Sequence, residues 1–398
     1  MNTQNGFLQT STFIVIIICI GLIGFSVYFL IHKNYLLKAI PEKIENEIST
    51  ENPISYIKTE KENDVIESSS NLSNEVREEY NGAVRHIFSH SLIIYPQKAL
   101  SDVKNLDGYK NNMLTVWQFK QIIQQLYENN FILIDAQLLY SFDKSGNIYQ
   151  NKLYLPSGKK PLILSVDDIS YYSYMENGGF ANKLVLENDV VKTEVLTPEG
   201  STIITNDGDI VPIVDEFVKE HPDFSLDGAK GIIGVTGFEG ILGYHTNWKG
   251  ERGDIERQHA TIIVDALKKT GWVFASHSFS HKQVFLSGEI TPDFLANDIS
   301  FWASEVEPIV GKTNIFIGPF GQVFLEGDPR RKQLIDAGFN ILYGVGMDNY
   351  TKFFSNYLVM NRTNIDGYRL RNNAEKLYEL FGILVDVDFS ANSMPING

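Results

Sequence analysis

Strand-length apolar runs alternate with amphipathic helical stretches along the chain after residue 84. The runs lie at 86–94, 131–134, 162–166, 232–236, 273–275 and 314–317, with two more near residues 341 and 357. Runs of this length are typical of strands, and the stretches between them have helical periodicity. Strands that alternate with helices indicate a parallel sheet, which is either open or closed into a barrel.

Start and stop signals define the helices between these runs. Thr115-Val116-Trp117-Gln118 is a capping-box pattern, and it precedes apolar positions at helical spacing. Further helices are predicted from a cap at Asp254 to Thr270 with a stop at Gly271, from Thr291-Pro292 to Gly311, and over 329–337.

The segment 170–230 interrupts this alternation. Its turn signals, such as Gly178-Gly179 and Asn206-Asp207-Gly208, separate short β-branched runs. We therefore expect β-hairpins to be inserted here, where they would shape the rim of a substrate site.

Residues 12–31 form an uncharged run of 20 residues within the 398-residue chain, which is about the length that spans a bilayer core. No basic start or small-residue cleavage site accompanies the run, so we interpret it as a retained membrane anchor. Lys33, Lys38 and Lys43 follow it, and the positive-inside rule taken alone would place the rest of the chain in the cytoplasm. The only cysteine, Cys19, lies inside the run, so it gives no information on the redox compartment.

The stretch after the run is polar and acidic. Residues 41–80 hold 11 acidic and 4 basic side chains, which is −7 of the formal net charge of −15. Such a composition is typical of a flexible tether. The expected organisation is a tail at 1–11, an anchor at 12–31, a linker at 32–83 and a catalytic domain at 84–398. The domain is only mildly acidic and has no basic patch, so we expect no nucleic-acid partner.

Candidate catalytic residues follow the predicted strands. Asp167 and Asp168 close the run at 162–166, and two adjacent carboxylates at the end of a buried strand are costly unless a cation or a reaction requires them. His277 and His281 follow the run at 273–275, and one helical turn between them would aim both imidazoles at one metal ion. These residues, the turn 318–321 and Arg362 would meet at the carboxyl edge of a parallel sheet or barrel, which favours a metallohydrolase.

Three motifs carry a resemblance to a known family. Ser165-Val166-Asp167-Asp168 resembles the Thr-Phe-Asp-Asp motif of the NodB-homology polysaccharide deacetylases of carbohydrate esterase family 4. His277-Ser278-Phe279-Ser280-His281 is similar to their His-Ser/Thr-x-x-His motif, and residues 316–321 are similar to their Pro-Tyr-Gly loop. The resemblance covers roughly residues 85–390. It implies a distorted (β/α)7 barrel, a divalent metal ion and hydrolysis of N-acetyl groups on a cell-envelope glycan, which would place the domain outside the cytoplasm despite the lysine bias.

The resemblance also implies a role for each residue. Asp168, His277 and His281 would bind a divalent metal, most simply Zn²⁺, and Asp167 would be the general base. Alternation along the strand is expected to point the two adjacent carboxylates in different directions. Pro319, Phe320 and Gly321 would form a tight turn whose backbone N–H at Phe320 stabilises the oxyanion.

Departures from the family pattern leave the identity of the general acid open. Ile317 stands where the family has arginine, and no Leu-x-His follows near the C-terminus. His90 is the predicted substitute as acid, and Arg362 is predicted to hold a carboxylate or an oxyanion. The leading hypothesis is a monomeric, membrane-anchored deacetylase. The alternative is a catalytically impaired relative that binds glycan only.

Each candidate residue also has an ordinary structural reading. The Asp pair could be a helix cap with a surface carboxylate, the two histidines polar loop residues, 319–321 a plain turn, and Arg362 a surface partner of Asp366. His86 and His90 stay open between the two readings. The signatures of serine hydrolases, zincins, nucleotide-binding phosphate loops and Cys-x-x-Cys sites are absent from the sequence.

Overall fold

A computed structural model describes residues 76–176 and 178–388. The predicted anchor at 12–31 and nearly all of the predicted linker at 32–83 lie outside these residues. Within the described part, no helix combines the length and the apolar character needed to cross a membrane.

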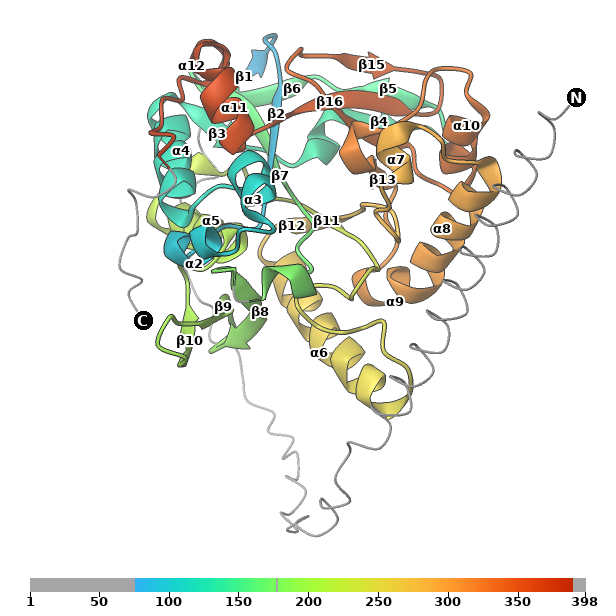
Figure 1. Ribbon diagram of the computed structural model, residues 1–398. Helices are drawn as coiled ribbons and strands as arrows, with labels where there is room; N and C mark the ends of the chain where they lie inside the picture. Colours follow the sequence, from blue (N-terminus) through green and yellow to red (C-terminus); the bar gives the residue numbers. More distant parts are fainter. Residues whose placement is uncertain (1–75, 177, 389–398) are drawn as a thin grey trace, which may run out of the picture. The chain divides into compact units, whose positions relative to one another are not determined.

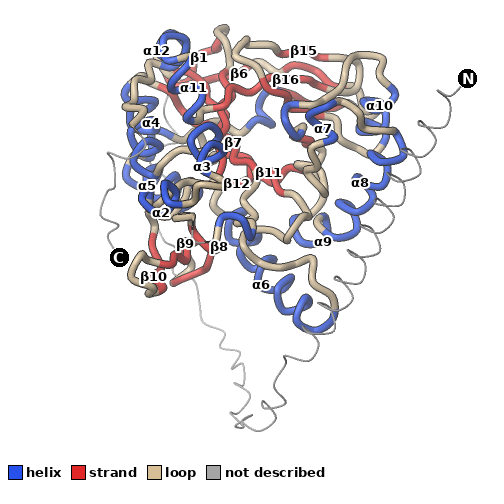
Figure 2. The backbone as a smooth tube through the Cα atoms, in the orientation of Figure 1, coloured by secondary structure: helices blue, strands red, loops and turns tan. Residues whose placement is uncertain are grey.

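Seven parallel strands form a closed barrel with helices around its outside (Figures 1 and 2). In order around the ring they are β2 (Arg85–His90), β7 (Lys160–Asp167), β11 (Gly231–Val235), β12 (Trp272–Ser276), β13 (Ile315–Ile317), β14 (Ile341–Val345) and β16 (Leu358–Asn364). Pairing of β11 with β7 closes the ring. The expected (β/α)7 barrel is thus confirmed.

Strand β7 closes the ring, and two different strands pair with successive parts of one of its edges. Its first residues pair with β3 (Phe131–Leu133), and its last residues, Ser165 to Asp167, pair with β11. The opposite edge of β7 pairs with β2 along its length. The ring is therefore closed at the end where β7 carries its aspartates.

The barrel strands divide their side chains between two cores. Alternate residues such as Ile163, Ile315 and Met360 pack into a cluster inside the barrel. Their neighbours, including Leu164 and Phe316, pack against the helices outside. This alternation fixes which strand residues can reach the interior of the barrel.

Sequence signals located four of the outer helices, two of them with errors in their extent, and no signal was assigned to the others. The main ones are α4 (Val116–Glu128), α6 (Gly250–Lys269), α8 (Pro292–Glu305), α10 (Pro329–Asp336), α11 (Gly367–Asn372) and α12 (Ala374–Phe381), and shorter ones are α2 (Pro96–Ser101), α3 (Leu106–Asn112), α7 (Val284–Ser287) and α9 (Glu307–Val310). The Thr115 capping box is confirmed. The predicted cap at Asp254 is wrong, because α6 begins one turn earlier and Asp254 pairs with Arg257 inside it. The helix from Thr291 is interrupted at Val306, between α8 and α9.

The inserted segment holds the expected hairpins and a helix that was not expected. Strands β8 (Ala181–Glu187), β9 (Val190–Leu196) and β10 (Thr202–Thr205) form an antiparallel sheet. Helix α5 (Ile210–Glu220) follows, with Asp209 as its N-cap. The prediction missed α5 because the turn residues before it obscured its apolar helical spacing.

The folded part also begins earlier than predicted. Strand β1 (Arg77–Tyr80), which falls in the predicted linker, pairs with β6 (Leu153–Pro156). Its side chains are mostly exposed, so backbone hydrogen bonds rather than apolar burial hold it. A hairpin of β4 (Tyr140–Phe142) and β5 (Ile148–Gln150) and a second antiparallel pair, β15 (Thr351–Phe353) with β16, complete the strands of the described residues.

Candidate metal and catalytic site

The predicted site residues meet where the barrel strands end. In the strand register His90 lies beside Asp167, and Asp167 lies beside Gly234. A cleft of about 750 Å³ opens at this end, and its lining includes both aspartates, both histidines of the His-x-x-x-His motif, His90, Phe320, Gly321 and Arg362. The expectation that these residues gather at the carboxyl edge of the barrel is confirmed.

Asp168, His277 and His281 form one potential metal-binding group. One ligand atom from each lies within 4.8 Å of the others. The Asp168 Oδ2 atom is 3.9 Å from His277 Nε2 and 3.6 Å from His281 Nε2. A carboxylate and two imidazoles match the donors that Zn²⁺ and similar ions take, so these residues fit a divalent metal ion.

The chain places both carboxylates at the site by leaving the strand at Asp168. Asp168 has φ of 59°, outside the strand conformation. As a result His277 Nε2 lies 3.8 Å from Asp167 Oδ2 and nearly as close to Asp168. The predicted divergence of the two side chains is therefore wrong, since alternation applies only within a regular strand.

The two histidines lie on a loop, not on the predicted helical turn. Ser278 and His281 have φ of 61° and 43°. Asp298, on α8, holds this loop by accepting hydrogen bonds from the backbone N–H groups of Phe279 and Ser280, at 2.7 and 3.0 Å. Sequence reasoning missed Asp298, although a carboxylate between Leu295 and Trp302 on a buried helix face was a usable signal.

Second-layer hydrogen bonds orient two of the potential ligands. His277 Nδ1 lies 2.9 Å from the carbonyl oxygen of Ile317, to which it donates as the neutral ring with Nε2 left as the ligand atom. The Tyr172 hydroxyl donates to Asp168 Oδ1 at 2.7 Å, which leaves Oδ2 toward the imidazoles. Tyr172 was also missed by sequence reasoning, because nothing in its spacing marks it.

Arg362 holds Asp167 in a buried bidentate ion pair. Its Nη1 and Nη2 atoms donate to the two Asp167 oxygens at 2.7 and 2.9 Å, and both side chains are almost fully buried. The Phe88 ring lies 4.0 Å from the Arg362 Cζ atom. Arg362 is therefore neither a surface partner of Asp366 nor open to a substrate oxyanion, and the carboxylate it holds is the protein's own.

The pKa shifts show how buried acids stay ionised here. Burial alone would raise the pKa of Asp167, but the Arg362 guanidinium and the His277 imidazole hold it below its usual value. Burial also opposes ionisation of Asp168, yet the imidazoles of His281 and His277 lower its pKa to about 2. Burial lowers the pKa of His277, which favours the neutral ring that a metal ligand requires.

His90 and His86 lie at different depths of the same strand. His90 lines the cleft, and its Nδ1 atom is 3.1 Å from the Asn112 carbonyl oxygen. His86 lies two inward-facing positions deeper and is 3% exposed. The predicted role of His90 as the acid stays a prediction.

The turn after β13 brings an aromatic side chain to the metal-binding group. Phe320 has φ of 54°, and its ring lies 4.7 Å from that of His281. A Cβ on Gly318 would come within 2.3 Å of the Gln322 carbonyl oxygen, so only glycine fits there. The turn is therefore tightly determined, while its predicted role at an oxyanion stays a prediction.

Exposed apolar side chains form the walls of the cleft. Tyr174 and Phe238 lie on loops that follow β7 and β11, and they are 45% and 52% exposed. Phe320 and Leu286 supply further apolar surface, at 47% and 59% exposure. Apolar walls around a few charged groups are typical of sites that bind an organic ligand.

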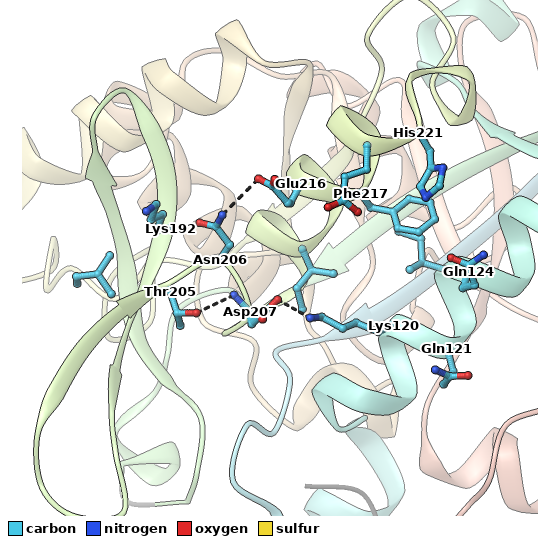
Figure 3. Close-up of a pocket in the computed structure, with 14 residues that line it drawn as sticks. Lys120, Gln121, Gln124, Lys192, Thr205, Asn206, Asp207, Glu216, Phe217 and His221 are labelled. Atoms are coloured by element: carbon cyan, nitrogen blue, oxygen red, sulfur yellow. Dashed lines mark hydrogen bonds and ion pairs between the residues drawn. The ribbon is translucent and has the colours of Figure 1, made fainter. Parts of the chain in front are cut away.

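A second cavity, of about 680 Å³, lies between α4, α5 and the inserted sheet (Figure 3). Among the groups that line it, Lys120 pairs with Asp207, and Asn206 donates to Glu216. It contains none of the predicted site residues.

Comparisons with known proteins give only distant similarities. No family model matches the chain, and no curated protein matches it. Three solved structures are similar, each at 12% sequence identity. A Streptococcus pyogenes deacetylase, PplD, in complex with acetate has a TM-score of 0.42, and the match covers 77% of this chain and 99% of that one. A de-N-acetylase from Aggregatibacter actinomycetemcomitans has a TM-score of 0.40 with coverages of 72% and 96%, and the BpsB deacetylase domain from Bordetella bronchiseptica has a TM-score of 0.28 with coverages of 53% and 73%.

Proposed function

We propose that this protein is a metal-dependent hydrolase that removes N-acetyl groups from a cell-envelope glycan. The observation that carries the proposal is the convergence of Asp168, His277 and His281 on one point, with the Asp167 carboxylate 3.8 Å from His277. Three protein ligands with an extra ionised carboxylate beside them form the arrangement that metal-assisted amide hydrolysis requires.

Each residue has a defined task in this proposal. A divalent metal ion at the site would supply Lewis acidity, which polarises an amide carbonyl and acidifies a water molecule. Asp167 accepts the proton of the attacking water, because it lies beside the ligands without being needed as one of them. Arg362 keeps Asp167 ionised and fixes both of its oxygens. His90 donates a proton to the departing amine, since it is the remaining histidine in the cleft.

The walls of the cleft support a sugar substrate. A pyranose ring has an apolar C–H face that packs on aromatic side chains, and Tyr174, Phe238 and Phe320 expose such surface in the cleft. The charged groups of the site line the same cleft, so an N-acetyl group of a bound sugar would be near them. Peptidoglycan and other polymers of N-acetylglucosamine belong to this class.

The uncharged run at 12–31 supports a membrane-anchored protein whose domain faces out of the cell, because its substrate class lies in the envelope. Protease treatment of intact cells is expected to remove residues 84–398. Complete protection while the membrane stays sealed would instead support the cytoplasmic orientation that the lysines after the run favour.

Acetate release tests the proposal directly. The full chain, purified in detergent and supplied with Zn²⁺, is expected to release acetate from N-acetylglucosamine oligomers, and a chelator should stop the release. If the protein binds the oligomers but releases no acetate with any of several divalent metals, the proposed enzymatic activity is wrong and the glycan-binding alternative is favoured.

A further inference from the structure

A short series of hydrogen-bonded polar side chains runs down from the candidate site into the mostly apolar interior of the barrel. Inward-facing positions below the cleft include Ile163, Ile315 and Met360. Among them lie Ser165 and His86, which are 0% and 3% exposed. Neither residue lines the cleft or has a task in the proposed reaction, so their polarity needs a separate explanation.

This series connects directly to the ion pair above it. Arg362 Nη1 donates both to Asp167 Oδ1 and to Ser165 Oγ, at 2.7 and 3.0 Å. On its other side Ser165 Oγ lies 3.0 Å from His86 Nε2. The hydrogen bonds therefore connect His86, Ser165, Arg362 and Asp167 in that order.

The lower hydrogen bond, between Ser165 Oγ and His86 Nε2, has two directions, one for each tautomer of the neutral His86 ring. If Ser165 donates its hydrogen to a neutral His86 Nε2, its lone pairs remain to accept from Arg362. If His86 donates instead, the two Ser165 lone pairs accept from His86 and from Arg362. Burial and the Arg362 charge lower the pKa of His86 well below its usual value, which agrees with a neutral ring. In both directions the His86 ring holds Ser165 Oγ within hydrogen-bond distance of Arg362 Nη1.

Stability alone does not account for His86. Its Nδ1 atom is buried without a hydrogen-bond partner among the described residues, as is Arg362 Nε. A buried polar atom without a partner destabilises the fold, so an apolar side chain of similar size would suit the position better on packing grounds.

We propose that His86 is a positioning residue for the candidate base: through Ser165 it fixes the Arg362 guanidinium, and through Arg362 the Asp167 carboxylate. The inference rests on the proposed deacetylase function and assigns part of that function to a residue outside the cleft. The guanidinium is then held on three sides, by Asp167, by Ser165 and by the face of Phe88.

The test uses His86→Met and Ser165→Ala in the full chain. Each variant is expected to keep its metal content, with a Tm for His86→Met equal to or above that of the unsubstituted protein. Each should lower kcat for acetate release by ~10-fold or more with KM nearly unchanged, because a base out of place slows the chemical step and not binding. His86→Gln, which can still accept from Ser165, should recover most of the loss. Tyr343→Phe is the matched control, since it removes another buried hydroxyl that lacks a partner among the described residues and should leave kcat unchanged.

Two further measurements separate positioning from general damage. The double variant His86→Met with Ser165→Ala should be no slower than Ser165→Ala alone, because both act along one path. In metal-free protein, hydrogen exchange at the Arg362 guanidinium, followed by NMR, should accelerate in His86→Met and not in Tyr343→Phe.

If His86→Met does not fold, Ser165→Ala and His86→Gln carry the same comparison. Unchanged kcat and unchanged exchange in a folded His86→Met, or additive effects in the double variant, would overturn the positioning role. Absence of acetate release by the unsubstituted protein would reject the proposed function, and the exchange measurement would still test the positioning.

Discussion

Asp167 at the end of the barrel and Asp209 at the start of α5 are both buried, and their surroundings treat the negative charge in opposite ways. At the end of the barrel, Asp167 and Asp168 lie among a guanidinium and imidazoles, and their pKa values fall. At the start of α5, Asp209 is equally buried but accepts hydrogen bonds only from neutral groups, among them the backbone N–H of Leu92 and of Ile210. There burial raises the pKa to about 6.

The difference shows what distinguishes a chemical site from a structural polar residue. Burial penalises a carboxylate in both places, and neutral donors alone do not offset the penalty at Asp209. Of the two places, the barrel end brings in a cation from another strand, the Arg362 guanidinium. A buried acid that stays ionised because distant parts of the chain neutralise it is therefore the stronger indication of function.

The largest expected effect comes from removing an imidazole at the barrel end. His281→Ala leaves two of the three potential ligands, so the protein should lose its metal ion and acetate release should fall by ~10³-fold or more. Metal content is measured on the purified protein by elemental analysis. His259→Ala, on the exposed face of α6, is the control and should keep both properties. Full metal content in His281→Ala would remove this residue from the ligand set.

Exchanging the two adjacent carboxylates for amides should separate their roles. Asp167→Asn keeps the three potential ligands, so metal content should stay while turnover falls by ~10²-fold, the usual contribution of a general base. Asp168→Asn should lose metal and turnover together. The opposite pattern, with metal lost only in Asp167→Asn, would mean that the two roles are reversed.

Arg362→Met would leave the buried Asp167 carboxylate without its guanidinium partner, in surroundings more like those of Asp209. Without its guanidinium partner the buried carboxylate should have a raised pKa, so the acidic limb of the pH–rate profile should move to higher pH. Removing one partner of a buried pair should also lower the free energy of unfolding by about 3 kcal/mol or more. Urea denaturation and the pH dependence of kcat measure the two effects. An unshifted profile with unchanged stability would contradict the importance of the pair.

The smallest effect is expected at Asp209 and has a defined sign. Its folded-state pKa is raised, so its contribution to stability is complete below its usual pKa near 3.8 and is lost as the pH rises through about 6. Asp209→Asn should therefore be more stable than the unsubstituted protein at pH 8, by about 2 to 3 kcal/mol, and equally stable near pH 4. Asp328→Asn, which changes a partly exposed helix cap that pairs with Arg330, should give no stabilisation at pH 8. Equal effects of the two substitutions would contradict the burial argument.

The parts of the fold and site that depend on local sequence were predictable. Strand-length apolar runs located the barrel strands, and positions just after those runs located Asp167, Asp168 and His277. The conformation of the loop from His277 to His281 was not predictable, because Asp298 of α8 determines it from 18 residues away or more.

Contacts that require the closed barrel were also beyond the sequence. The sequence placed Arg362 at the same end of the barrel and predicted that it holds a carboxylate or an oxyanion, but nothing near it indicates that its partner is Asp167, which is 195 residues away in the chain. Helix α5 was missed for a local reason, since turn residues directly precede its apolar face. Asp254 was misread because a capping residue type also occurs inside helices, where it pairs with a neighbouring arginine.

Among the described strands, β16 comes last in the chain, and it carries Arg362. A ribosome releases the earlier strands first, so the nascent chain contains Asp167 long before it contains the residue that neutralises it. Until β16 inserts between β14 and β2, the carboxylate has to stay hydrated, and the barrel cannot close around it without the cost of a bare charge. Closure of the ring and neutralisation of the candidate base therefore both depend on β16, and a chain that ends before residue 362 has neither a closed barrel nor a complete candidate site.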